Sequence, residues 1–80
     1  MKYATGKAYF RRHSTYSIMV LRDKDSWDIY YADKGTDFRF AFGLPLATRL
    51  SRVFYVAERN IDLYMDILFD EGNEVYVSHN

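Results

Sequence analysis

Residues 45–71 read PLATRLSRVFYVAERNIDLYMDILFDE, and this stretch decides the predicted fold. Its apolar residues recur three or four positions apart, the spacing of one buried face of an α-helix. These residues are Leu46, Ala47, Leu50, Val53, Phe54, Ala57, Ile61, Tyr64, Met65 and Leu68. Four acidic residues lie four positions apart, so a helix gathers them into one stripe: Glu58, Asp62, Asp66 and Asp70. The stretch therefore predicts an amphipathic helix with one apolar and one acidic side.

The same stretch contains signals for where the helix begins, breaks and ends. Pro45 suits a first helical turn, and Gly72 suits a C-terminal stop. One straight helix through the whole stretch would be about 39 Å long and would overhang strands of about 20 Å. The sequence thus fits either one long helix or two helices broken near Asn60, which could cap the second. A strand over residues 52–56 is less favoured, because the helical spacing continues through them.

Upstream of the helix, three segments alternate in the manner of strands with one buried side. They cover residues 15–21, 27–32 and 37–42, and residues 2–12 and 74–78 are weaker candidates. The third segment, DFRFAF, would place Phe38, Phe40 and Phe42 on one side. We therefore predict one α+β domain over residues 1–80. It has an antiparallel meander sheet of three to five strands, with one long or broken helix packed on one face.

Composition supports a packed core, since hydrophobic residues make up 49% of the chain and aromatic residues 19%. The predicted core consists of Ile18, Val20, Trp27, Ile29, Phe38, Phe40, Phe42, Leu50, Phe54, Ala57, Ile61, Met65 and Leu68. The chain has no cysteine, which excludes disulfides and thiolate metal sites. Its first residues lack the apolar region of a signal peptide, and no run is long enough to span a membrane. We expect a cytoplasmic protein with no membrane partner, located in the host cytoplasm if it is phage-encoded.

Charge is distributed unevenly although the formal net charge is zero. Residues 1–22 carry five basic and no acidic side chains, whereas residues 58–80 carry six acidic side chains and one basic. The neutral total argues against binding nucleic acid through bulk positive charge. The two ends would neutralise each other if the first strands lay beside the acidic helix.

No motif indicates catalysis, a cofactor or a metal site. His13 and His79 have no nucleophile or carboxylate at a recognisable spacing. A ribonuclease-like site of Arg11, Arg12 and His13 is the best enzymatic alternative, and a solvated strand end explains the same residues. Residues 23–34 lack the ligands of a calcium loop, and the four glycines are isolated, so no phosphate loop is present. We expect a protein that is not an enzyme and that has no cofactor or metal.

The acidic stripe is the main functional signal. Like charges four apart destabilise a helix by about 0.2–0.5 kcal/mol per pair, and acids at the C-terminus oppose the helix dipole. A row of carboxylates can imitate phosphates and dock on the basic, nucleic-acid-binding surface of a partner protein, with exposed rings as anchors. The predicted partner-binding residues are Glu58, Asp62, Asp66, Asp70, Tyr55 and Phe69. The alternative is an acidic face that is merely solvated, or one neutralised by the basic N-terminal strands.

A second hypothesis is a small domain that binds single-stranded nucleic acid. Arginines among aromatic rings on a sheet face can hold phosphates and stack bases. The candidate residues are Arg11, Arg12, Tyr30 and Arg39. Tyrosine on an outer sheet face also packs against neighbouring strands, which is the structural explanation of the same pattern.

In size, lack of cysteine, aromatic content and acidic surface, the chain resembles small phage-encoded proteins that block host enzymes, including anti-CRISPR proteins. The resemblance is one of general character and transfers no residue role. It implies a non-catalytic inhibitor or adaptor that binds a host nucleic-acid-handling complex. The sequence leaves the oligomeric state open, since an exposed edge strand could form a dimer.

Overall fold

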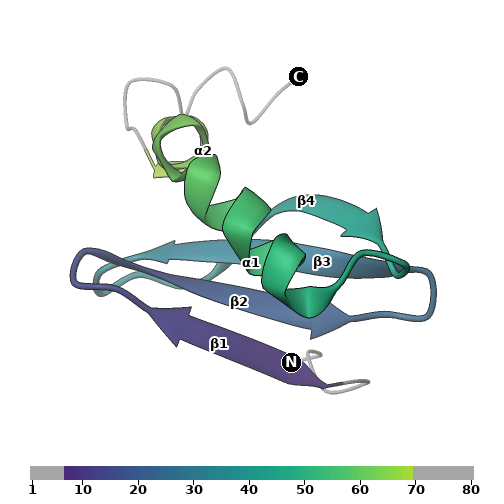
Figure 1. The fold of residues 1–80 in the computed structure, drawn as a ribbon. Helices are drawn as coiled ribbons and strands as arrows, with labels where there is room; N and C mark the ends of the chain where they lie inside the picture. The colour runs from purple at the N-terminus through teal and green to yellow at the C-terminus, as the bar shows by residue number, and fades with distance from the viewer. Residues whose placement is uncertain (1–6, 70–80) are drawn as a thin grey trace, which may run out of the picture.

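The computed structural model describes residues 7–69, which form four strands followed by two helices (Figure 1). The elements are β1 (Ala8–Arg12), β2 (Tyr16–Arg22), β3 (Ser26–Asp33), β4 (Arg39–Pro45), α1 (Leu50–Arg59) and α2 (Ile61–Phe69). The strands form one antiparallel sheet in the order β1-β2-β3-β4, and both helices lie on the same side of it (Figure 1). This α+β meander confirms the predicted fold class. The candidate strand at residues 74–78 lies outside the described residues.

The face of the sheet beneath the helices contains the main core. Alternation along β2 and β3 turns one set of side chains toward the helices, and α1 packs its own apolar side against them. Burying each large side chain of this kind stabilises the fold by about 1.5–3 kcal/mol. The fully buried members are Ile18, Val20, Ile29, Tyr31, Val53 and Ala57.

The helical region breaks at Asn60, as the length of the strands predicts. The side-chain nitrogen Nδ2 of Asn60 donates to the carbonyl of Val56 at 2.9 Å, and its backbone N–H donates to the same carbonyl at 3.2 Å. The Asn60 side chain therefore caps the C-terminal end of α1. Asn60 was predicted to cap the start of α2 with its side chain. There it contributes only its backbone carbonyl, which accepts from the Tyr64 N–H at 3.1 Å. Neither helix is long and apolar enough to cross a membrane in the part of the chain that the structure describes.

The helix begins later than predicted. Pro45 is the last residue of β4, where it pairs with Ser26, and α1 starts at Leu50. The connecting loop is fixed to the sheet because the indole Nε1 of Trp27 donates to the Thr48 carbonyl at 3.0 Å. The prediction of a first helical turn at Pro45 is wrong, because pairing with β3 carries the strand through the proline. The alternative strand over residues 52–56 is wrong too, since those residues lie in α1.

A β-bulge in β4 changes which phenylalanines face the helices. Ile29 pairs with Phe42 and the next residue, Tyr30, pairs with Phe40, so Ala41 is an extra residue in β4. Phe42 therefore packs on the core, whereas Phe40 lies on the opposite face of the sheet. The prediction that Phe38, Phe40 and Phe42 share one side is wrong. We call the side of the sheet away from the helices the open face.

The hairpin between β3 and β4 is tight. Gly35 has a φ of 82°, a left-handed conformation that favours glycine. The Thr36 N–H donates to the Asp33 carbonyl at 3.0 Å, and the Lys34 N–H donates to the Asp33 carboxylate at 2.9 Å. These bonds close the turn over residues 33–36 and fix the backbone of Lys34.

Candidate functional site

Glu58, the first residue of the predicted acidic stripe, is paired within the protein. Its Oε2 atom lies 3.2 Å from Nη1 of Arg11 and 3.1 Å from Nε2 of His13. The Arg11 guanidinium also lies over the Phe54 ring, 4.4 Å from its centroid. Glu58 therefore joins α1 to β1 and to the turn after it. For this residue the structural alternative holds, in which the basic N-terminal strand neutralises the helix.

Tyr55 is surrounded by arginines. Its side chain is 46% exposed, and the guanidinium carbons of Arg52 and Arg59 lie 5.2 and 5.7 Å from the ring centroid. Nη1 of Arg59 also donates to the Tyr55 hydroxyl at 3.1 Å. Within residues 7–69, no carboxylate forms an ion pair with either arginine. We call Arg52, Tyr55 and Arg59 the basic patch; it occupies the exposed side of α1.

Acidic residues of the stripe remain exposed on α2. Asp62 and Asp66 are both exposed, and Leu63 beside them is an exposed large apolar side chain. Burial first, and then the charges of Glu58 and Asp62, raise the pKa of Tyr16. We call Asp62, Leu63 and Asp66 the acidic patch. Asp70 lies outside the described residues.

Phe69, the second predicted anchor, packs inward. It is partly buried against the core, and the guanidinium carbon of Arg39 lies 4.7 Å from its ring centroid. Nη1 of Arg39 also donates to the Leu68 carbonyl. Arg39 therefore attaches α2 to β4, and its side chain has a structural role. Of the five predicted partner-binding residues that the structure describes, Glu58 is paired and Phe69 packs inward, so the five do not form one continuous exposed surface.

The four residues predicted to bind nucleic acid divide between the two faces of the sheet. Arg11 and Arg39 contact the helices, whereas Arg12 and Tyr30 belong to the open face. The Arg12 guanidinium carbon lies 5.8 Å from the centroid of the Phe10 ring. Only half of the predicted set is thus brought together.

Aromatic rings cover the open face. Phe10 of β1 and Phe38, which precedes β4, meet edge to face with centroids 5.9 Å apart, although β1 and β4 are the two edge strands. Met19 of β2, which pairs with Phe10, is only 2% exposed although neither α1 nor α2 lies on this side. Phe40 lies 5.5 Å from Tyr30 in a similar edge-to-face contact. Phe10 and Phe40 nevertheless remain about half exposed, so this apolar surface is only partly closed.

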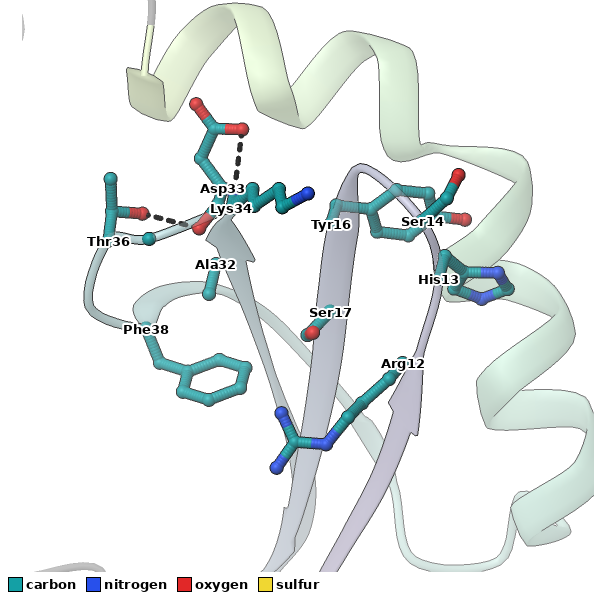
Figure 2. A pocket seen from close by; sticks show the side chains of 11 residues that line it. Arg12, His13, Ser14, Tyr16, Ser17, Ala32, Asp33, Lys34, Thr36 and Phe38 are labelled. Atoms are coloured by element: carbon teal, nitrogen blue, oxygen red, sulfur yellow. Dashed lines mark hydrogen bonds between the residues drawn. The ribbon is translucent and has the colours of Figure 1, made fainter.

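A pocket of about 300 Å³ lies at one end of the open face, between the β1–β2 and β3–β4 turns (Figure 2). Ser17 and Ala32, which pair across β2 and β3, lie at its base. Arg12, Lys34 and Phe38 line its sides. In Figure 2 the His13 ring points away from Arg12, in agreement with its contact to Glu58.

The sequence contained a signal for the basic patch that the prediction did not use. Arg52 stands three residues before Tyr55 and Arg59 four residues after it, and these are the positions that adjoin a residue on a helix. The pocket had no such local signal, because it depends on the sheet register that brings two turns together. Searching residues 7–69 finds no group of three or more His, Cys, Asp or Glu side chains arranged to hold a metal ion.

These surfaces offer several groups that could bind a ligand or a partner. The basic and acidic patches offer charge and one exposed ring, and the open face offers apolar area and a cationic pocket. No family model, curated protein or solved structure matches the chain, so the arrangement of its own residues carries the functional argument.

Proposed function

We propose that the protein is a non-catalytic binding module, an inhibitor or adaptor that docks on a partner protein through the outer side of its helices. The observation that carries this proposal is Tyr55, an exposed ring held between Arg52 and Arg59. Tyrosine and arginine are enriched among the residues that dominate protein–protein binding. The two arginines keep the ring in one place, so it is prepared to act as an anchor.

The fold offers little reason for this arrangement. Exposed cation–π contacts contribute about 0.5–1 kcal/mol, and two like charges beside one ring repel each other. In the described part of the chain, neither arginine is neutralised by an acid. An acidic group on a partner would supply the missing counter-charge and exclude water from the ring.

The neighbouring acidic patch favours a protein partner over a nucleic acid. The basic patch extends over about 10 Å along α1, and Asp62 and Asp66 follow on α2. A long polyanion that followed the helices would pass from favourable to repulsive charges. A protein surface can instead place an acidic group over the basic patch and a basic group over the acidic patch.

The sequence predicts a partner with a basic surface, and we keep that prediction here. This surface would face Asp62 and Asp66, without Glu58, which pairs with Arg11. A nucleic-acid-handling complex has such a region, and the resemblance to small phage inhibitors points to the same class of partner. The proposal adds an acidic region beside it.

The experiment is co-purification with tagged protein from a nuclease-treated lysate of the cells in which the protein occurs. Two double variants reverse one patch each: Arg52→Glu with Arg59→Glu, and Asp62→Lys with Asp66→Lys. The matched control is Lys24→Glu, an exposed charge reversal in the β2–β3 turn. We expect the wild type and the control to retain the same protein, and each double variant to lose it by about tenfold or more.

Circular dichroism verifies that each variant is folded. The proposal is wrong if both double variants retain the partner, or if the captured material disappears on nuclease treatment and reappears without it. The second result would favour the nucleic-acid-binding alternative.

A further inference from the structure

We propose that the pocket at the end of the open face binds a nucleoside monophosphate, with its phosphate between Arg12 and Lys34 and its base against the Phe38 and Phe10 rings. Arg12, Ser17 and Ala32 of its lining belong to the open face, away from the helices. The site does not depend on the basic or acidic patch, so either proposal can fail without the other.

The pocket has the size and composition of a small-ligand site. Its volume of about 300 Å³ is at the lower end of the range for such sites, which suits a single nucleotide better than a longer ligand. The hydroxyl of Ser17 at its base can donate to a phosphate or ribose oxygen, whereas the Thr36 hydroxyl at its side already donates to the Asp33 carbonyl at 2.9 Å. Lys34 and Thr36 come from the tight β3–β4 turn, so part of the wall is already ordered.

The charges in the pocket fit a phosphate. Arg12 and Lys34 are both exposed, and neither forms an ion pair with a carboxylate of residues 7–69. Arginine can hold phosphate through two parallel N–H bonds, and lysine adds a point charge. Asp33 is the one acidic residue of the lining, and its Oδ1 accepts the Lys34 backbone N–H. In Figure 2 the Asp33 carboxylate lies on the far side of Lys34 from the Arg12 guanidinium.

The rings beside the pocket fit a base. Phe38 lines the pocket itself, and Phe10 continues the aromatic surface with half of its side chain exposed. Arg12 lies over Phe10, so its guanidinium is held along this surface next to Phe38. Flat bases stack on such rings and on guanidinium groups. One ligand that carries a ring and a phosphate would satisfy both halves of the site.

The rest of the open face argues for one nucleotide and against a strand. Asp28 lies toward the other end of this face, where it pairs with Leu21 and Gly43 and accepts a bond from Ser26 Oγ at 2.7 Å. A polyanion that continued from the pocket along the strands would approach this carboxylate. At the pocket end, Arg12 and Lys34 line one site together, whereas Lys24 at the other end stands between Asp23 and Asp25.

The test is a titration of the ¹⁵N-labelled full chain followed by amide chemical shifts. The probes are adenosine monophosphate, adenosine, inorganic phosphate and a 5′-phosphorylated tetranucleotide. We expect adenosine monophosphate to shift the amides of Ser17, Lys34 and Thr36 and to bind more tightly than adenosine or inorganic phosphate. Arg12→Ala or Lys34→Ala should raise its Kd by about tenfold, the loss of one charge-assisted contact.

Two further variants make the result specific. Lys24→Ala removes an equally exposed lysine from the other tight turn and should leave the Kd unchanged. Phe38→Leu should raise the Kd for adenosine monophosphate and leave the Kd for inorganic phosphate unchanged. The proposal is overturned if no shifts occur around the pocket, if adenosine binds as tightly as its phosphate, or if Lys24→Ala has the same effect as Lys34→Ala. Tighter binding of the tetranucleotide, with shifts reaching Tyr30, would also overturn it in favour of strand binding.

Discussion

The two faces of the sheet hide apolar side chains by different means. Beneath the helices, residues such as Ile29 and Tyr31 are excluded from water by a second layer of secondary structure. On the open face, Met19 is buried almost as completely beside Phe10 and Tyr30, its partners on the two neighbouring strands. A helix layer closes its face, whereas the rings leave Phe10 half exposed and a pocket at one end. Structural burial and an accessible binding surface thus coexist on the open face.

An antiparallel sheet with one covered face usually turns polar side chains to the water on the other. Here the second face keeps Phe10, Met19, Tyr30 and Phe40. Large exposed apolar patches commonly mark sites of interaction. Three substitutions test how far the two faces differ in packing.

The largest effect is expected for Ile29→Ala in the helix-covered core. The side chain is fully buried, so its removal should lower the free energy of unfolding by about 2–5 kcal/mol. Urea denaturation measures the loss. Met19→Ala is the matched change on the open face, and we expect it to cost less because Phe10 and Phe38 can settle into the space. Equal losses would mean that the ring cover packs as rigidly as the helix layer.

An intermediate effect is expected for Phe10→Ala. Loss of a half-exposed ring should cost about 1–2 kcal/mol and should expose Met19 to solvent. Urea denaturation gives the first quantity, and the rate of Met19 oxidation by peroxide, followed by mass spectrometry, gives the second. Phe40→Ala is the control, since Phe40 is similarly exposed and contacts Tyr30 instead. If the control accelerated Met19 oxidation equally, Phe10 would not be its cover.

The smallest effect is expected for Tyr31→Phe, and it depends on pH. The Tyr31 hydroxyl donates to the Ala57 carbonyl at 2.5 Å, a bond whose loss should cost about 1 kcal/mol at neutral pH. Burial, followed by the nearby Tyr64 and Tyr16, raises the pKa of Tyr31 above its ordinary value of 10.0. The unfolded chain therefore ionises first, so this contribution is complete below pH 10 and falls as the pH rises above it.

Denaturation at a series of alkaline pH values measures this dependence. The wild type should lose stability above pH 10 more steeply than Tyr31→Phe. The variant keeps part of the slope, because the pKa of Tyr16 is raised as well. Identical slopes for the two proteins would show that the Tyr31 hydroxyl ionises as easily in the folded state as in the unfolded chain.

The meander and the helical region could be predicted because their signals are local, whereas the sequence left open whether that region forms one helix or two. Alternation over a few residues marks each strand, and the apolar spacing of α1 and α2 marks the helices. Pro45 was misplaced because its role depends on pairing with Ser26, nineteen residues earlier in the chain. A proline at the end of an edge strand and a proline in the first turn of a helix look alike in sequence.

The candidate sites were predicted less completely, since their neighbours come from distant parts of the chain. Glu58 meets Arg11 across 47 positions, and the sequence left open whether the acidic stripe would be free or paired. The neighbours of Tyr55 could be predicted from the sequence, because Arg52 and Arg59 adjoin it on a single helix. The pocket could not be predicted, because the sheet register, and no local pattern, brings Arg12 and Lys34 to the lining of one pocket.

The bulge at Ala41 has a consequence for how the chain can change over generations. Because Ala41 is an extra residue in β4, Phe42 and Phe40 lie on opposite faces of the sheet. Loss of the Ala41 codon would leave Phe42 opposite Ile29 and Phe40 opposite Tyr30 in a regular ladder, so both rings would keep the faces they have now. The chain can therefore lose this residue over generations without exchanging the rings of the two faces.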